Sequence, residues 1–363
     1  GIILDDASSK LVLNPITLDS ASTSSDSLGM DVDANSTITS LSVGHITPLS
    51  IATGKRLSGA VTVSAGSIKL NETGTLASTV SMTGGKLDVD ETFTLSGELT
   101  QSGNITIDVA TDKTLTYSGA GVNLGANTLT LTGGGTLGNS NDLVFNNAQS
   151  KLLLNSITVS KVGTSTDNLG LDVDSDSTVN SLSVSHITPL SIAAGTSLDG
   201  AITVSAGSIK LNETGTLAST VAMSGGTLDV DETFTLSGAL SQSGSITIDV
   251  LTDKTLTYSG AALNLGANTL TLSGGGTLSN TNALVLNHGN SLLSLSGIKT
   301  LGDIEGSVSS NADKGVSVTS SATMGDYDLG VVSNLSIGGA GVTLAGQLNL
   351  NPGGEIFTSG AGK

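Results

Sequence analysis

Alternating side chains with oxygen atoms occur at two equivalent places in the chain. The residues are Asp31, Asp33 and Asn35 in the first and Asp172, Asp174 and Asp176 in the second. Oxygen ligands at the first, third and fifth positions resemble the start of a calcium-binding loop. Calcium is therefore the one cofactor that the sequence suggests. The alternative is an ordinary strand with Val32 or Val173 buried and the acidic side chains in solvent.

Two features of these segments favour the strand. The sixth position lacks the glycine of a calcium loop, and the twelfth is Ser42 or Ser183 rather than glutamate. The acidic segment Asp88–Glu91, repeated at Asp229–Glu232, has the same ambiguity. Calcium at Asp31 and Asp172 thus stays a hypothesis beside the plain strand.

The histidines give little support to catalysis. His45 and His186 occupy the same position of a long repeat (186 − 45 = 141), and His288 is the third histidine. A nucleophilic triad needs a unique convergent serine, histidine and acid, so repetition favours a corner or packing role. Tryptophan is absent, and the three tyrosines are isolated: Tyr117, Tyr258 and Tyr327. Because sugar-stacking platforms are then missing, we predict that the chain is not an enzyme.

Charge excludes one class of partner. The chain has 31 acidic and 13 basic residues, a formal net charge of −18. Nucleic-acid binding requires clustered lysine and arginine to neutralise phosphates, so we expect no nucleic-acid partner. No apolar run approaches the roughly 18 residues of a membrane span, so we expect no membrane insertion. Sugar attachment is an option at Asn-x-Ser/Thr sequences, which begin at Asn35, Asn71, Asn104, Asn212 and Asn334. Such short sequences also arise by chance in a chain rich in serine and threonine.

The elements that would position these residues can be read from one stretch, SIKLNETGTLAS. It spans Ser67–Ser78 and returns unchanged at Ser208–Ser219. Ile68 and Leu70 alternate with polar residues, which is typical of a strand with one buried face. A turn follows, and two more short strands end before Gly84. Three short strands and three corners in about 20 residues predict one coil of a β-solenoid.

The sequence as a whole predicts an all-β fold, a single elongated β-solenoid of roughly 18 coils with about 20 residues per coil. Inward aliphatic residues recur at intervals of 19, 19, 19, 20 and 22, namely Ile38, Leu57, Leu76, Leu95, Leu115 and Leu137. We expect these to stack in one ladder. The polar segment Ser160–Asp167 is expected to bulge outward as a loop.

A longer repeat overlies the coils, and equivalent positions in its copies differ by 141 in number. Gly66 returns as Gly207 and Asp88 as Asp229. We interpret residues 1–363 as one continuous solenoid, with long repeats at 1–141, 142–282 and 283–363, the last partial and divergent.

Two segments of the sequence resemble a known kind of protein. TDKTLTYSGAGVNLGANTLTLTGGGTL (Thr111–Leu137) and LDVDETFTLSG (Leu87–Gly97) resemble the passenger regions of bacterial autotransporters and filamentous-haemagglutinin-like adhesins. The resemblance implies a right-handed parallel β-helix, extracellular or on the cell surface, that works as an adhesin, stalk or matrix fibre.

Our first functional hypothesis is a structural or adhesive surface protein, a rod-like repeat unit that assembles end to end into filaments. Its expected partners are copies of itself, head to tail, and lateral contact through Lys69, Asn71 and Glu72 is an alternative to simple solvation of these residues. The alternative is a surface-binding module for a glycan, a mineral or ice that uses outward threonine and aspartate ladders. Thr128–Thr132 contains the Thr-x-Thr pattern that ice binding would repeat. A polysaccharide-degrading β-helix is the least favoured hypothesis.

Overall fold

The computed structural model describes residues 1–306, 315–329, 332–338, 342–350 and 355–359. It is an all-β parallel β-solenoid of about 16 turns that lie about 20 residues apart, and the described residues form no helix. This confirms the predicted fold class, with slightly fewer turns than the roughly 18 expected. The right hand of the helix stays a prediction.

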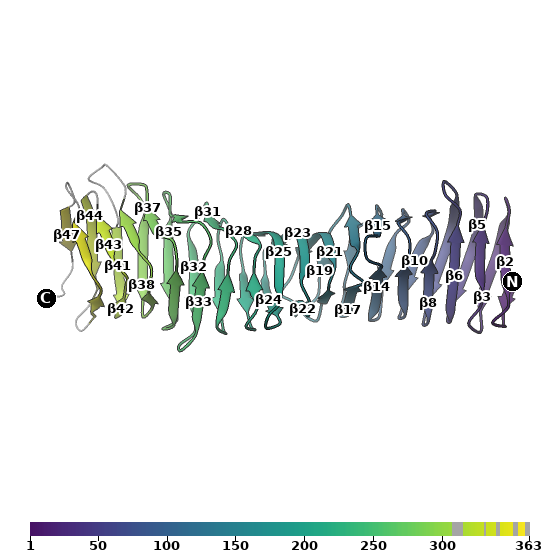
Figure 1. Ribbon diagram of the computed structural model, residues 1–363, viewed down its shortest axis with the longest axis horizontal. Coiled ribbons are helices and arrows are strands. Elements are labelled where there is room, and N and C mark those ends of the chain that lie inside the picture. The colour runs from purple at the N-terminus through teal and green to yellow at the C-terminus, as the bar shows by residue number, and fades with distance from the viewer. Residues whose placement is uncertain (307–314, 330–331, 339–341, 351–354, 360–363) are drawn as a thin grey trace. The chain divides into compact units, whose positions relative to one another are not determined.

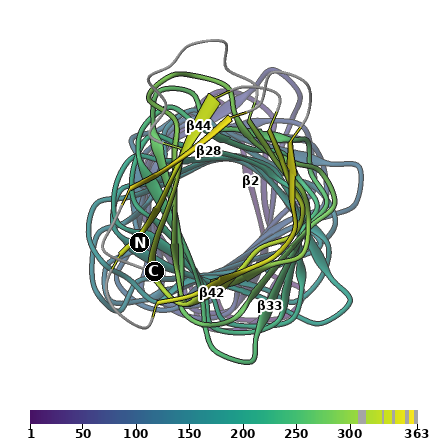
Figure 2. The ribbon, with the colours of Figure 1, turned by 90° about the vertical axis from the view of Figure 1, so that its left-hand side faces the viewer.

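The chain divides into two compact units, Gly1–Leu182 and Ser183–Lys363. Within each unit, strands of successive coils lie side by side in parallel pairs (Figure 1). Figure 2 shows the backbone of the coils winding around an interior, which buried side chains fill. Each coil therefore buries its apolar face only by stacking on its neighbours.

Three sheets make up the units. Sheet B takes one strand from each coil and carries the surface described below. Its strands in the first unit are β2 (Lys10–Leu13), β4 (Gly29–Val32), β6 (Ile46–Ile51), β8 (Ser67–Leu70), β11 (Lys86–Val89), β14 (Ile105–Val109), β17 (Thr128–Thr132), β20 (Lys151–Asn155) and β22 (Gly170–Val173). Its strands in the second unit are β24 (Ile187–Ile192), β26 (Ser208–Leu211), β29 (Thr227–Val230), β32 (Ile246–Val250), β35 (Thr269–Ser273), β38 (Leu292–Ser296), β41 (Gly315–Ser320), β44 (Val332–Ile337) and β47 (Glu355–Ser359).

Sheet A forms other sides of the coils. In the first unit its strands are β1 (Ile2–Leu4), β3 (Thr17–Thr23), β5 (Ser36–Val43), β7 (Arg56–Val63), β9 (Thr75–Leu76), β10 (Thr79–Met82), β12 (Phe93–Leu95), β13 (Leu99–Gln101), β15 (Thr114–Tyr117), β16 (Val122–Asn123), β18 (Thr136–Asn139), β19 (Leu143–Phe145) and β21 (Thr158–Thr164). β23 (Ser177–Val184) includes residues of both units.

The remaining strands belong to the second unit. Those of sheet A are β25 (Ser197–Val204), β27 (Thr216–Leu217), β28 (Thr220–Met223), β30 (Phe234–Leu236), β31 (Leu240–Gln242), β33 (Thr255–Tyr258), β36 (Thr277–Asn280), β39 (Lys299–Thr300), β42 (Ala322–Thr323) and β45 (Leu344–Ala345). Sheet C contains β34 (Leu263–Asn264), β37 (Leu284–Leu286), β40 (Ile304–Gly306), β43 (Tyr327–Leu329) and β46 (Leu348–Leu350).

A continuous ladder of buried side chains lies behind sheet B in each unit. In the first unit its members are Thr47, Ile68, Leu87, Ile107, Leu131, Leu154 and Val173. In the second unit the ladder begins with Thr188, Ile209, Leu228, Ile248, Leu272 and Leu295. Burial of one such aliphatic side chain stabilises the fold by about 1.5–3 kcal/mol. Strict alternation then directs every second residue of sheet B outward.

The expected ladder of sheet A is only partly right. Leu57, Leu76 and Leu95 do stack in register. Ile38, however, pairs with Gly59, and Leu95 pairs with Tyr117 instead of Leu115. A strand offers two inward positions two residues apart, so the spacing along the sequence does not determine which of them is the neighbour.

The prediction of a loop at Ser160–Asp167 is wrong for its first half, because Ser160–Thr164 belongs to β21. A buried amide explains how a polar segment is held in the sheet. Asn139 is 2% exposed, and its Oδ1 atom accepts hydrogen bonds from the backbone N–H groups of Ser160 and Lys161. Its Nδ2 atom donates to the carbonyl of Lys161 at 2.7 Å. The side chain of Asn139 thus binds the backbone that the sequence suggested was free.

Candidate functional site

The outward side chains of β8, β11 and β14, together with Asp90 directly after β11, form what we call the first charged face: Lys69, Lys86, Asp88, Asp90 and Asp108. Parallel register places Lys69 beside Asp88, and Asp88 beside Asp108. The alternation of these strands turns the aliphatic residues inward, so the charged residues necessarily share the outer side. Stacking of coils has therefore gathered charges that are about one coil apart in sequence.

Two lysines bridge the carboxylates of this face. Lys69 Nζ lies 3.7 Å from Asp88 Oδ2 and 3.5 Å from Asp90 Oδ2. Lys86 Nζ lies 3.2 Å from Asp88 Oδ1 and also pairs with the carboxylate of Asp108. Burial acts to lower the pKa of Lys86, but its hydrogen bonds to Asp108 and Asp88 outweigh burial and raise that pKa. The ion pairs of Lys86 therefore favour its charged ammonium form.

The second charged face reproduces this arrangement in the second long repeat, with one change. Lys210 Nζ lies 3.3 Å from Asp229 Oδ2 and 3.3 Å from Asp231 Oδ2. Asp229 again lies beside Asp249 in register. Thr227, however, stands where the first face has Lys86 (227 − 86 = 141). The second charged face therefore has no lysine at this position to bridge Asp229 and Asp249.

The missing lysine changes the electrostatics of the second face. Burial is the main cause that raises the pKa of Asp229, and the nearby Asp231 and Asp249 raise it further against the effect of Lys210. Hydrogen bonds to Asp229 and Asp231 raise the pKa of Lys210. The hydroxyl of Ser273 donates to Asp249 Oδ1. The two faces thus share a pattern but differ in how their carboxylates are neutralised.

A further ion pair recurs at the next corner of the coil. Lys113 Nζ lies 2.6 Å from Glu91 Oε2 in the first repeat. Lys254 Nζ lies 2.5 Å from Glu232 Oε2 in the second. Both the outward charges of the sheet and those of the corner therefore occur twice.

The six residues proposed for calcium lie at the ends of β4 and β22. Val32 and Val173 are fully buried, as the strand interpretation expects. Asp31 Oδ2 lies 2.5 Å from Lys10 Nζ, and Asp172 Oδ2 lies 2.6 Å from Lys151 Nζ. An ammonium group of the preceding strand thus already accompanies the first carboxylate of each segment.

The other proposed ligands are exposed: Asp33, Asn35, Asp174 and Asp176. In the part of the chain that the structure describes, no group of three or more histidine, aspartate or glutamate side chains is arranged to hold a metal ion. Calcium binding stays a prediction, and we derive nothing further from it.

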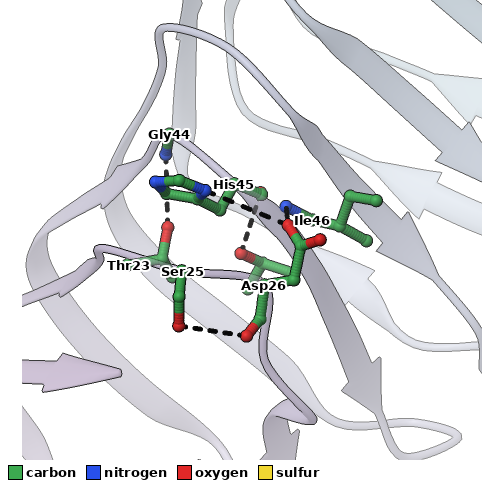
Figure 3. A network of polar contacts seen from close by, with 7 residues as sticks. Thr23, Ser25, Asp26, Gly44, His45 and Ile46 are labelled. Atoms are coloured by element: carbon green, nitrogen blue, oxygen red, sulfur yellow. Dashed lines mark hydrogen bonds and ion pairs between the residues drawn. The ribbon is translucent and has the colours of Figure 1, made fainter. Parts of the chain in front are cut away.

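His45 lies at a corner between β5 and β6, where polar contacts join adjacent coils (Figure 3). Its Nδ1 atom is 4.0 Å from Asp26 Oδ1. The same oxygen accepts a hydrogen bond from Ile46 N at 2.9 Å, and Thr23 Oγ1 accepts one from Gly44 N at 3.2 Å. Asp26 and Thr23 therefore bind the backbone of the following coil.

Ser25, Asp26 and His45 contain the residue types of a nucleophilic triad, but their contacts differ from one. The hydroxyl of Ser25 donates to the backbone carbonyl of Asp26 at 3.2 Å rather than to the imidazole. His186, the repeat equivalent of His45, has its Nδ1 atom 2.9 Å from Ser185 Oγ. Both histidines lie between two strands, at a corner of their coil.

Sequence reasoning marked the acidic segments but missed the lysines that pair with them. The numbers of Lys69 and Asp88 differ by one coil length (88 − 69 = 19), which makes them candidate neighbours, and the register of β8 and β11 then places them side by side. The three tyrosines are at most 2% exposed: Tyr117, Tyr258 and Tyr327. Their rings are therefore not available at the surface for stacking against a sugar.

Sheet B of the second unit also carries a column of outward hydroxyl groups, which we call the hydroxyl column. Its half-exposed members are Ser208, Thr227, Thr247, Thr271, Ser294, Ser317 and Ser336. The column runs beside Asp229 and Asp249 of the second charged face. In the first unit, Lys86 and Leu153 interrupt the corresponding column.

The comparisons with known proteins add no relative. No protein-family model, no curated protein and no solved structure matches the chain. The described residues contain no helix long and apolar enough to cross a membrane.

Proposed function

We propose that the chain is an extracellular structural or adhesive protein of the cell surface, comparable in role to the passenger region of an autotransporter. The observation that supports this proposal is the duplication of the outer charges. Lys69, Asp88 and Asp90 recur as Lys210, Asp229 and Asp231 with the same pairings.

Duplicated surfaces suit contact with a partner that is itself repetitive. Once one charged face has bound, the second binds at a high effective concentration, so that the combined affinity exceeds that of either face. Such a partner is a second copy of the chain, which gives lateral and head-to-tail assembly, or a regular extracellular surface. Fixed charges on strands lose little entropy on contact because the stacked coils hold them in place.

The location is tested on intact cells of the organism that makes the protein. A membrane-impermeant biotin reagent should label the chain, with Lys55 and Lys10 as exposed targets. A cytoplasmic protein of the same cells serves as the negative control. A chain that becomes labelled only after lysis would contradict the proposal.

Adhesion is tested with beads coated with the full chain. The measured quantity is the number of beads that attach to one another, to glycan-coated glass and to bare glass. Lys69→Glu should weaken attachment modestly, as should Lys210→Glu. The double variant should weaken it further than either single variant, because neither charged face then binds. Sedimentation velocity and electron microscopy of the same proteins report self-association directly.

Lys55→Glu provides the matched control, because it changes the net charge equally at an exposed lysine to which the described residues give no ion pair. It should leave attachment unchanged. Beads that bind no better than beads with an acidic globular protein would refute adhesion, and a chain that is monomeric at every concentration would refute the assembly part.

The hydroxyl column favours a second candidate function, binding of a regular surface such as a glycan, a mineral or ice. Its members are spaced by the separation of adjacent strands, about 4.8 Å. The Thr-x-Thr pattern of β17 does not continue, since Thr128 and Thr130 pair with Lys151 and Leu153. The column of the second unit is therefore the better candidate for such a surface.

This second function is tested by replacing Thr247 and Thr271 with lysine, which interrupts the column as Lys86 does in the first unit. Binding to a glycan array, to hydroxyapatite or to ice should fall in the variant. The control is Thr116→Lys on an exposed position of β15. Thermal hysteresis and array signals equal to buffer in the unmodified chain would remove this candidate.

A further inference from the structure

We propose that Asn71 and Asn212 are a pair of N-glycosylation sites, one on each copy of the same turn. Each begins the sequence Asn-Glu-Thr, and all three residues are exposed in both copies. The turns lie between β8 and β9 and between β26 and β27, outside any strand. Among the described residues, neither asparagine side chain has a hydrogen-bond partner. The amide nitrogen that would accept a sugar is thus accessible in both turns.

A structural role does not account for the retained motif. Asparagine in a turn often adopts positive φ or binds nearby backbone, but neither residue has positive φ. Thr73 Oγ1 bonds to Thr53 Oγ1 at 2.6 Å, whereas Ala194 stands at the equivalent of Thr53 (194 − 53 = 141). Thr214 therefore keeps the third position of the motif without the hydrogen bond that Thr73 makes.

Other Asn-x-Ser/Thr sequences of the chain are positioned differently. Asn104 Oδ1 accepts a hydrogen bond from Thr128 N at 2.8 Å, and its repeat equivalent Ser245 accepts the same bond from Thr269 at 3.1 Å. Asn104 is thus part of the structure, and the residues after it enter β14.

The two remaining sequences can be set aside for separate reasons. Asn35 precedes β5, where Ser36 is buried, and its repeat equivalent is Asp176. The side chain of Asn334 lies outside the described residues. The Asn-Glu-Thr turns are therefore the described sequences that combine exposure, an unpartnered amide and presence in both repeats.

The modification requires a glycosyl diphosphate as co-reactant and a transferase. The Nδ2 atom of asparagine forms a bond to C1 of the sugar, the bond from C1 to the diphosphate oxygen breaks, and the amide proton passes to a base of the transferase. The hydroxyl of Thr73 or Thr214 would help the transferase recognise the peptide. A sugar on each turn would add a neutral, hydrated group beside the charged faces.

Trypsin separates the sites, so mass spectrometry of the full chain from its native cells tests the proposal. Cleavage after lysine releases Asn71 in peptide 70–86, Asn212 in peptide 211–254 and Asn104 in peptide 87–113. The first two should carry sugar masses that fragmentation places on asparagine, and the third should not. Single sugars indicate a nucleotide-linked donor, whereas a preassembled oligosaccharide indicates a lipid-linked one.

Variants made in the same cells complete the test. Asn71→Gln and Asn212→Gln should each remove one sugar mass from the intact chain, and Thr214→Val should remove that of Asn212. Because these side chains are exposed and unpartnered, the circular dichroism spectrum should not change. Peptides 70–86 and 211–254 found only at their unmodified masses, or equal modification of Asn104, would overturn the proposal.

Discussion

Lys86 Nζ lies 3.2 Å from Asp88 Oδ1 on the outer side of β11, and the second repeat has the aspartate without the lysine. In the first repeat, Lys86 bridges the carboxylates of Asp88 and Asp108. In the second repeat, the equivalent Asp229 and Asp249 lie side by side without that lysine. Because the surrounding coils are otherwise nearly identical in sequence, exchange of these two positions isolates the effect of one charge on a β-solenoid.

The separate substitutions Lys86→Thr and Thr227→Lys should change the free energy of unfolding in opposite directions. Lys86→Thr should lower the free energy of unfolding by about 0.2–1 kcal/mol, the range of partly exposed ion pairs, and Thr227→Lys should raise it by a similar amount. Urea unfolding at low salt measures both, and the differences should shrink in 1 M salt, where screening acts within about 3 Å. Lys55→Thr is the control without an ion pair, and an effect of equal size there would contradict the argument.

Asp229 should make stability depend on pH with a defined sign. Burial, Asp231 and Asp249 raise its pKa in the folded chain above the ordinary 3.8. The folded state then binds the proton more tightly than the unfolded state, so this contribution to stability is fully present below 3.8 and is lost as the pH rises through the folded pKa. Carboxyl-carbon NMR titration should place the pKa of Asp229 above 3.8.

The same titration has a built-in control. Thr227→Lys should lower the pKa of Asp229, because an added ammonium favours the ionised carboxylate. Asp229→Asn should abolish this pH-dependent component in unfolding experiments. A pKa of Asp229 at or below 3.8 in the unmodified chain would contradict the effect of burial, with that of the neighbouring carboxylates, on this side chain.

Removal of the Tyr117 hydroxyl should destabilise the fold. It accepts a hydrogen bond from Leu99 N at 3.1 Å and donates to the carbonyl of Ala120 at 2.6 Å. Tyr117→Phe leaves the buried N–H of Leu99 without this acceptor, which should cost about 1–3 kcal/mol in the free energy of unfolding, whereas water can replace the hydroxyl at the carbonyl of the exposed Ala120. Hydrogen exchange of the Leu99 amide should accelerate as well. Unchanged exchange would contradict the assignment, and Thr116→Val on the exposed side of the strand is the control.

Truncation of the sheet A ladder should be more costly than any surface change. Leu76 is fully buried and stacks between Leu57 and Leu95. Leu76→Ala should lower the free energy of unfolding by about 2–5 kcal/mol, because the stacked coils can collapse only partly around the cavity. Calorimetry or urea unfolding measures the loss, and Thr75→Ala at the half-exposed neighbour should cost less than about 1 kcal/mol. Equal losses in the two variants would mean that the ladder does not carry the stability.

Local residue patterns determined the fold class. Alternation within SIKLNETGTLAS identifies Ile68 and Leu70 as inward and Lys69 as outward, because successive side chains of a strand point to opposite faces. The turn of Asn71 and Glu72 followed from the same stretch. Both conclusions depend only on neighbours in sequence, and the structure confirms them.

The sequence did not determine the register between strands of neighbouring coils. Whether Leu95 meets Leu115 or Tyr117 depends on how each corner closes, and both pairings satisfy the alternation. The polar segment in β21 became a strand because Asn139, in the coil before it, binds its backbone. Such contacts join residues that are about one coil apart and leave no local signal.

The sequence by itself thus determined that the chain folds into coils, which residues face inward, and that the outer charges recur in the second long repeat. Only the tertiary structure decided which charges meet: Lys69 with Asp88 and Asp90, and Lys86 with Asp88 and Asp108. The physical reason is that side-chain direction is a property of one strand, whereas an ion pair depends on the register that stacking imposes on neighbouring strands.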